Sequence, residues 1–521
     1  MRVKRRTMHI RFTAAMALIL MVGCNNHDNG GGGGNPSKST PQRGALLQSP
    51  PAQVASFGTA DLLTMLGGTA TGQLLLQFSY TPTCSITVYH LEYYTVDPAG
   101  NVTPASGALM VPSGSSSCEG GRPIVVYAHG TSTDRNYDIA DLNASDNDEG
   151  LLLAAMFAAQ GYIVVAPNYV GYDTSTLTYH PYLDADQQSK DMIDALTAAR
   201  SALPTSAVPG TTDGGKLFIT GYSQGGYVAM ATHRAMQSAG MAVTAAAPLS
   251  GPYALSAFAD AIFEGEVDMD APTNVTLLST SYQHAYGNLY TSASDVFAAP
   301  YSADITNLLP STTPLSQLET AGDIPANAVF SSVPPAAGDA AITPATMPAN
   351  LASVFAAGFG TQFLILNSYR LSYLQDAAQN PDGGFPTVTD GLPPANPKNT
   401  LRMDLKTNDL RTWAPAAPTL LCAGSSDPVV FYLNTQLIQG YFASAAPAAP
   451  VTLLDIDSPA TSNDPYATLK ADFVIAKDAV AVSAVAGGAT DGGASAVLND
   501  YHATLVPPFC LSAAKSFFDS H

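Results

Sequence analysis

The chain has 521 residues, with 21 lysines and arginines against 41 aspartates and glutamates, which gives a formal net charge of −20. So acidic a chain lacks the basic face that phosphate contacts require, and nucleic acid is therefore not an expected partner. Hydrophobic residues make up 46% of the chain, which permits a large core, while charged residues make up 12%, about half the usual share.

The first 23 residues have the pattern of an export signal. Residues 1–11 contain five basic residues and no acidic residue, and an apolar run follows over 12–23. This run is shorter than the ~20 residues of a membrane-spanning helix. The stretch Leu20-Met21-Val22-Gly23-Cys24 resembles the lipobox of bacterial lipoproteins, with Met21 where leucine is usual. The resemblance implies a lipidated Cys24 and a place in the bacterial envelope, at the outer membrane. The alternative is an ordinary signal peptide and a secreted protein.

Residues 24–50 are predicted to be a flexible tether. They include five consecutive glycines, Gly30 to Gly34, together with serine, proline and asparagine, and they have no apolar periodicity. A coil of this length reaches ~28 Å, enough to hold a domain clear of a membrane surface.

Strand and helix patterns alternate through 51–251. The predicted strands are 85–96, 102–112, 123–128, 162–167, 217–220 and 243–249. The predicted helices are 150–160, 187–203 and 226–238. The first two strands form a hairpin at a sheet edge, and the later strands are uninterrupted apolar runs. This alternation predicts an α/β fold with a mainly parallel sheet flanked by helices.

The alternation stops over 252–417, which is rich in proline, threonine, serine and alanine. We expect a large cap inserted in the sheet, with one long helix over 351–378. The sheet resumes in 418–521, with strands at 419–423 and 451–456, helices at 429–441 and 505–519, and a second insertion over about 458–499.

The five cysteines fit an oxidising compartment. If Cys24 is lipidated, four remain, and four cysteines allow three pairings. We favour Cys84 with Cys118, which bracket the first strands, and Cys422 with Cys510, which join a strand to the last helix. Four free buried thiols are the alternative.

The stretch Gly221-Tyr222-Ser223-Gln224-Gly225 follows a predicted strand and precedes a predicted helix. A G-x-S-x-G sequence in this context is typical of a nucleophile elbow, in which a sharp turn exposes the serine. The backbone N–H of Gln224 would face an oxyanion at the positive end of the helix.

The base and the acid follow from chain order. Among nine histidines, His502 alone follows the last predicted strand and precedes the last helix, the position of the base in the order Ser, Asp, His. Asp427 lies at the tip of a turn after the strand 419–423 and is the predicted orienting acid. Asp455 and Asp457 are weaker rivals.

A second oxyanion donor is expected after the strand 123–128. His129-Gly130-Thr131 occupies that turn, and the backbone N–H of Thr131 is the predicted donor, with a structural role for His129.

These motifs resemble the α/β-hydrolase superfamily, and the large insertion is similar to that of lid-bearing secretory lipases. The resemblance implies a serine carboxylesterase or lipase that acts on small-molecule or lipid esters through an acyl-enzyme on Ser223. A monomer is expected. No metal motif or dinucleotide fingerprint occurs, so no metal and no cofactor is expected. The alternatives are a serine peptidase of the prolyl-oligopeptidase type and a non-catalytic binding protein on the same fold.

Aromatic residues of the expected cap admit two interpretations. They could line an acyl tunnel, or they could form the core of the cap itself. They are Tyr282, Tyr286, Phe355, Phe359 and Phe363.

Overall fold

The computed structural model describes residues 41–68, 72–73, 76, 81–144, 147–203, 210–336 and 343–521. The expected signal peptide, Cys24 and the greater part of the expected tether lie outside the described residues.

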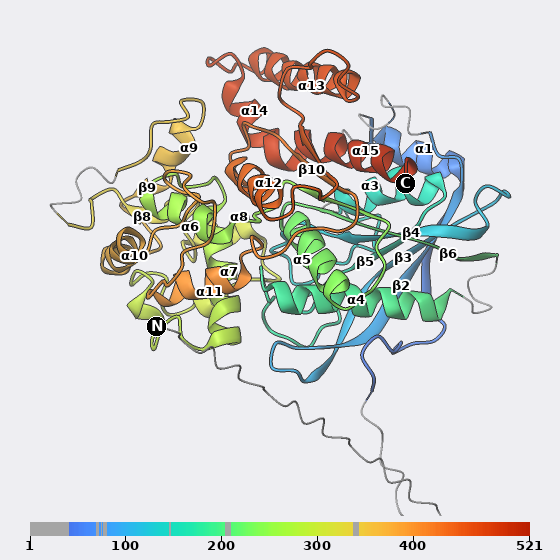
Figure 1. Cartoon of the computed structure of the whole chain (residues 1–521), viewed down its shortest axis with the longest axis horizontal. Coiled ribbons are helices and arrows are strands. Elements are labelled where there is room, and N and C mark those ends of the chain that lie inside the picture. Colours follow the sequence, from blue (N-terminus) through green and yellow to red (C-terminus); the bar gives the residue numbers. More distant parts are fainter. Residues whose placement is uncertain are drawn as a thin grey trace, which may run out of the picture. The chain divides into compact units, whose positions relative to one another are not determined.

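A nine-stranded sheet organises the described chain, in the order β1-β2-β3-β5-β4-β6-β7-β10-β11 (Figure 1). The strands are β1 Ala52–Phe57, β2 Ser85–Val96, β3 Val102–Ser113, β4 Gly120–Ala128, β5 Ile163–Pro167, β6 Thr211–Tyr222, β7 Ala245–Leu249, β10 Thr419–Ala423 and β11 Val451–Asp455. The six strands β5, β4, β6, β7, β10 and β11 are parallel to their neighbours in this order. The strands β1, β2 and β3 pair antiparallel, and β3 is also antiparallel to β5. The predicted mainly parallel sheet is therefore confirmed.

Helices flank this sheet in two packed pairs. The helix α4 packs against α5, and α3 packs against α15. The helices of this part of the chain are α1 Thr59–Gly68, α3 Asp148–Met156, α4 Ala185–Ala202, α5 Gln224–Ser238, α12 Leu433–Ala445, α13 Ala467–Ala486, α14 Ala494–Asp500 and α15 Val506–Asp519, with the short helical turns η1 Ala158–Gln160 and η5 Tyr501–Leu505. The central strands β5, β7 and β10 are buried along their whole length, as the apolar runs predict.

Between β7 and β10 the chain forms a separate group of short elements, here called the 252–417 insertion (Figure 1). Its elements are α6 Leu255–Glu264, α7 Ala271–Tyr286, η2 Ala293–Asp295, η3 Ile305–Asn307, α8 Leu315–Ala321, β8 Phe330–Ser331, α9 Ala352–Ala357, β9 Phe359–Gly360, α10 Asn367–Gln379 and α11 Thr400–Asn408. The helices α10 and α11 pack on α6.

The predicted single helix over 351–378 is wrong. The chain there forms α9, then the short strand β9 paired with β8, then α10. Gly358 lies so close to Val267 that a Cβ on the glycine would collide with that side chain. Because Phe359 and Gly360 pair with β8 instead of continuing the helix, apolar content alone was misleading here.

The N-terminal edge of the sheet also differs from the expectation. The unpredicted strand β1 pairs with β2, so the hairpin of β2 and β3 is not the edge. Ahead of β1, the N–H of Gly44 donates to the carbonyl of Tyr94 at 2.7 Å and that of Leu47 to Glu92 at 2.9 Å. These residues belong to the expected tether, but their backbone is hydrogen-bonded to β2.

Both favoured disulfides are present, with Cα–Cα distances of 5.7 Å for Cys84–Cys118 and 5.6 Å for Cys422–Cys510. The first ties the start of β2 to the start of β4, and the second ties β10 to α15. Both join elements that lie far apart in the chain.

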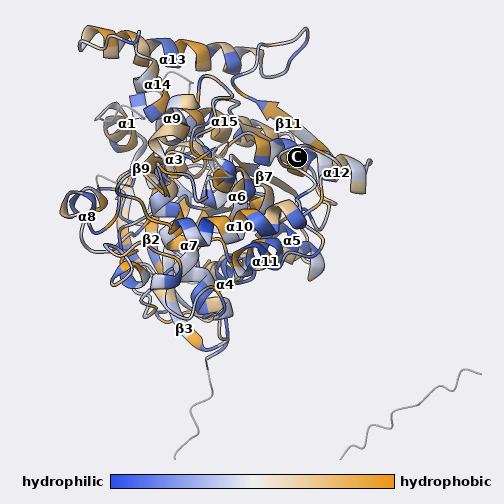
Figure 2. Ribbon diagram, turned by 90° about the vertical axis from the view of Figure 1, so that its left-hand side faces the viewer, coloured by the Kyte–Doolittle hydropathy of each residue, from blue (hydrophilic) through white to orange (hydrophobic). Residues whose placement is uncertain are grey.

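Hydrophobic residues line much of α13 (Figure 2). Only Phe473 of this helix is buried, while Val474, Ile475, Val482 and Val485 are exposed. Across the ranges that the structure describes, no helix is long and apolar enough to cross a membrane.

Candidate active site

Ser223 lies in the turn between the end of β6 and the start of α5. Its φ is +59° and its ψ is −125°, a conformation that side chains rarely adopt. A Cβ on Gly221 or on Gly225 would collide with the carbonyl of Ala128 on the neighbouring strand β4. The two glycines therefore let the strained turn pass close to β4, as a nucleophile elbow requires.

The structure brings Ser223, His502 and Asp427 together. The Oγ of Ser223 lies 2.8 Å from Nε2 of His502, and Nδ1 of His502 lies 2.7 Å from Oδ2 of Asp427. His502 lies in the π-helical turn η5, directly before α15. These two contacts make a continuous path for a proton from the serine to the imidazole, with a carboxylate behind it.

Asp427 is buried and held in place on both oxygens. Its Oδ1 accepts from the backbone N–H groups of Val429 at 2.9 Å and Val430 at 3.0 Å, which leaves Oδ2 for His502.

The two rival acids have other partners. Asp455 accepts from the N–H of Ser425, while Asp457 accepts from the hydroxyl of Tyr501 and pairs with Lys477. The structure thus places the sequence-predicted acid, rather than either rival, next to the imidazole.

Tyr222 is a site residue that the sequence did not reveal. Its hydroxyl donates to the carbonyl oxygen of His502 at 2.7 Å. Because Tyr222 is the last residue of β6 and directly precedes Ser223, this bond ties η5 to the elbow.

The charge around His502 favours its protonated form. Burial lowers the pKa of His502, but the charge and hydrogen bond of Asp427, with the charges of Asp270 and Asp268, outweigh burial. The net pKa lies above the usual value of about 6.5.

The predicted oxyanion donors lie at the same cavity as Ser223. Both Thr131 and Gln224 line it, and within the described chain neither backbone N–H donates to a protein acceptor. The hydroxyl of Thr131 donates to that of Tyr182 at 3.0 Å, and Tyr182 donates to Oδ1 of Asn274 in α7 at 3.1 Å. The 252–417 insertion therefore helps to hold the Thr131 turn.

His180 orients the side chain of Gln224, a role that the sequence did not predict. Nδ1 of His180 donates to the carbonyl of Val170 at 2.9 Å, so Nε2 can accept from Nε2 of Gln224 at 2.7 Å. Burial lowers the pKa of His180 to about 3, so the ring is neutral and available as an acceptor.

His129 lies behind the turn that it begins. Its ring stacks on Tyr169 at 4.2 Å between centroids, and Nδ1 lies 2.7 Å from the carbonyl of Gly130. These contacts agree with the predicted structural role.

Glu149 is a second acid beside the elbow that sequence patterns did not single out. Both of its carboxylate oxygens accept from the N–H of Gly130, each at 3.1 Å. Gly130 directly precedes Thr131, the predicted oxyanion donor. Burial raises the pKa of Glu149 to about 7, although the hydrogen bond from Gly130 and the charge of His502 act the other way. The residue therefore titrates near neutral pH within the same cavity.

The cavity above Ser223 has a volume of about 400 Å³. Its floor comes from the sheet side, and its apolar wall comes from the insertion. The wall residues include Leu255, Phe258, Ile262, Val275 and Leu278. The acids Glu149, Asp268 and Asp270 also line it. A mainly apolar cavity with a few convergent polar groups is typical of a small-molecule site.

The five aromatic residues singled out above, Tyr282, Tyr286, Phe355, Phe359 and Phe363, do not line this cavity. Tyr282 and Phe355 are fully buried, and Phe359 packs on Phe330 at 5.8 Å between centroids. Their position favours the second interpretation, in which they form the interior of the insertion.

Comparisons with known proteins agree with this architecture. The prolyl oligopeptidase family matches residues 152–289, a stretch that includes the elbow. The solved structure of the rice cell wall degrading esterase LipA from Xanthomonas oryzae has a TM-score of 0.62 and 26% identity, covering 83% of this chain and 95% of that one. A Legionella pneumophila protein has a TM-score of 0.60 at 19% identity, covering 91% and 97%, which supports the fold alone. A comparison with curated proteins finds no match.

The chain is an α/β-hydrolase that resembles the lipases and esterases of that superfamily. The fold expected from the sequence is thereby confirmed.

Proposed function

We propose that this protein is an exported serine carboxylesterase of the lipase type. The observation that carries the proposal is the Ser223–His502–Asp427 hydrogen-bonded series at the floor of a largely apolar cavity. The resemblance to an esterase at 26% identity supports the same class of reaction.

In the proposed mechanism, Nε2 of His502 takes the proton of Ser223 as Oγ attacks the ester carbonyl. Asp427 holds the neutral imidazole in the tautomer with the proton on Nδ1 and stabilises the imidazolium that forms. The N–H groups of Gln224 and Thr131 stabilise the tetrahedral oxyanion, and each such donor contributes about 3–4 kcal/mol of transition-state stabilisation. His502 then protonates the leaving alcohol, and water activated by the same ring releases the acid.

The cavity walls define the class of ester. Leu255, Phe258 and Leu278 suit an apolar acyl group, and a volume of about 400 Å³ holds a small or medium-sized substrate. The carboxylate of Asp270 disfavours substrates that carry a negative charge near the ester. We therefore propose neutral esters with an apolar acyl part, for which the 252–417 insertion serves as the cap.

A peptidase is the second candidate, because the prolyl oligopeptidase family matches the stretch around the elbow.

The experiment that separates the two candidates compares wild type and Ser223→Ala on p-nitrophenyl esters of increasing acyl length and on a chromogenic prolyl peptide. We expect ester hydrolysis by the wild type, loss of it in Ser223→Ala with an unchanged circular dichroism spectrum, and no peptide cleavage. Faster turnover of the prolyl peptide than of every ester would replace the proposal by the peptidase. Ser223→Ala activity within tenfold of wild type would overturn the mechanism.

The cellular location is a further part of the proposal. Two disulfides agree with an oxidising compartment. Residues 1–23 are proposed as the signal and Cys24 as a lipid-anchored N-terminus at the bacterial outer membrane. Cys24→Ala should move the protein from the membrane fraction to the soluble fraction, and retention on the membrane would show that the anchor lies elsewhere.

A further inference from the structure

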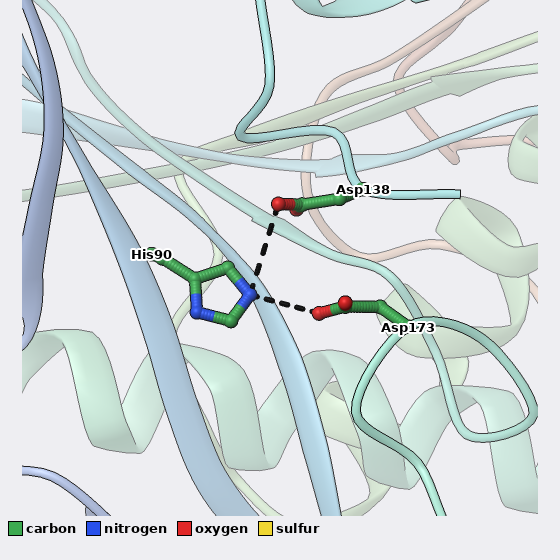
Figure 3. Close-up of side chains that lie close together, drawn as sticks. All are labelled: His90, Asp138 and Asp173. Atoms are coloured by element: carbon green, nitrogen blue, oxygen red, sulfur yellow. Dashed lines mark hydrogen bonds and ion pairs between the residues drawn. The ribbon is translucent and has the colours of Figure 1, made fainter. Parts of the chain in front are cut away.

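We propose that His90, Asp138 and Asp173 form a structural binding site for a divalent transition-metal ion of the Zn²⁺ type. The three side chains point toward one another (Figure 3). Nε2 of His90 lies 2.8 Å from Oδ2 of Asp173 and 3.8 Å from Oδ2 of Asp138. His90 belongs to β2, while the two aspartates belong to the chain segments after β4 and after β5.

The spacing of the three donor atoms suits a small ion. Ligand atoms placed tetrahedrally at about 2.0–2.2 Å from zinc lie about 3.3–3.6 Å from one another. The two observed distances fall on either side of that spacing, so small side-chain adjustments would admit the ion. All three donor atoms already lie within 4.8 Å of one another.

Hydrogen bonds from neighbouring residues hold the carboxylates in position. Nδ2 of the buried Asn168 donates to Oδ1 of Asp138 and to Oγ of Ser106, both at 3.0 Å. Ser106 donates in turn to Oδ2 of Asp173 at 2.6 Å. The N–H of Ala140 also donates to Oδ1 of Asp138, at 3.0 Å. Such outer partners orient the ligands of established metal sites.

The imidazole alone does not satisfy both carboxylates. A single Nε2–H can be donated to Asp173 at 2.8 Å, and at 3.8 Å Asp138 lies beyond hydrogen-bond distance from the same atom. A divalent ion bound between neutral His90 and the two carboxylates would contact all three donors and balance both negative charges.

The donor set distinguishes between classes of metal. One imidazole and two carboxylates suit Zn²⁺, whereas Ca²⁺ takes six to eight oxygen ligands. The three side chains are half-buried, with 16% of the surface of His90 and 23% of that of each aspartate exposed, so water can complete the coordination.

The location indicates a structural role. The ion would join β2 to the segment after β4, which begins with the Thr131 turn, and to the segment after β5. It would therefore stabilise the loops beside the cavity without contacting the substrate.

The test uses the full-length protein after chelator treatment and dialysis. Isothermal titration with ZnCl₂ and metal analysis by mass spectrometry should find one Zn²⁺ per chain. The thermal midpoint should rise with Zn²⁺ concentration, because a ligand that binds only the folded state stabilises it by mass action. CaCl₂ at equal concentration should give little rise, and an equal rise with Ca²⁺ would overturn the assignment to a transition metal.

Asp138→Asn is the informative variant, since its remaining oxygen can still accept from Asn168 and Ala140. Without metal it should unfold at or above the wild-type temperature, and it should lose the Zn²⁺-dependent rise. Asp134→Asn is the matched control, because Asp134 is a half-buried aspartate of the same loop whose Oδ1 accepts from the N–H of Asn136. This control should keep the full rise.

His90→Gln provides a second ligand change that keeps a polar side chain on β2. An equal Zn²⁺-dependent rise in wild type, Asp138→Asn and His90→Gln would mean that zinc binds elsewhere and would overturn the proposal. Absence of any stoichiometric Zn²⁺ binding to the wild type would overturn it equally.

Discussion

The nine-stranded sheet and the 252–417 insertion are stabilised in different ways. The central strands bury continuous apolar runs. Two of the candidate catalytic residues directly follow strands of the sheet: Ser223 follows β6, and Asp427 lies in the turn after β10. The insertion contains buried ion pairs in addition to its apolar interior. Its two clusters centre on Arg402 and Arg411, both of which are almost completely buried.

The cluster around Arg402 joins three parts of the insertion. Its guanidinium donates to both oxygens of Asp260 in α6, at 2.9 and 2.7 Å, and to Asp376 in α10 at 2.8 Å. Arg411 forms an equivalent cluster with Asp382 and Asp409. Planar, bidentate contacts of this kind fix the relative orientation of the segments that they join.

The candidate catalytic residues and the cavity wall therefore depend on different parts of the molecule, the sheet side and the insertion. The first prediction tests the sheet side and has the largest expected effect. Asp427→Asn should lower kcat by up to ~10⁴, because the imidazole would be held in the wrong tautomer. His502→Ala should cost at least as much.

Coupling between these two residues provides the control. The double variant should be little worse than His502→Ala, since triad members act as a unit. Steady-state kinetics on a p-nitrophenyl ester give all three values. Nearly wild-type activity in Asp427→Asn, together with a severe loss in Asp455→Asn, would move the acid to the next strand.

The second prediction tests the insertion side. Arg402→Met removes the cation that pairs with the buried carboxylates of Asp260 and Asp376 and leaves them only neutral donors, which should cost about 3–5 kcal/mol of unfolding free energy. Arg200→Met is the control, because the pair of Arg200 with Asp213 is far more exposed and should contribute only about 0–1 kcal/mol. Urea denaturation followed by circular dichroism measures both. Equal losses in the two variants would show that buried ion pairs do not hold the insertion together.

The same contrast explains what could be predicted from the sequence. The sheet was predictable because runs such as 123–128 and 162–167 carry a burial signal within a few residues. The positions of Ser223, Asp427 and His502 followed from turn chemistry and chain order. The buried ion pairs of the insertion left no such signal, since Arg402 and its partners are polar residues from three distant segments.

Contacts between distant residues account for the other omissions. Glu149 reaches Gly130, and His180 reaches Gln224, only through the fold. The residues His90, Asp138 and Asp173 likewise form no local spacing motif, so the sequence gives no sign of this cluster.

The last prediction concerns the meeting point of the two regions and has the smallest expected effect. Asp270 of the insertion raises the pKa of His502, a residue of the sheet side. A serine hydrolase needs neutral His502, so kcat/KM should fall as pH decreases through a pKa above about 6.5. Asp270→Asn removes one negative charge, which lowers this pKa and moves the acid limb of the profile to lower pH. Because Asp270 is exposed and water screens its charge, the movement should be less than about one pH unit.

Asp323→Asn is the control, because Asp323 is an exposed acid of the insertion that lies outside the cavity. This variant should leave the acid limb of the pH profile in place. High salt should reduce the difference between Asp270→Asn and wild type. An unchanged limb in Asp270→Asn at low salt would show that the insertion shapes the cavity without tuning the base.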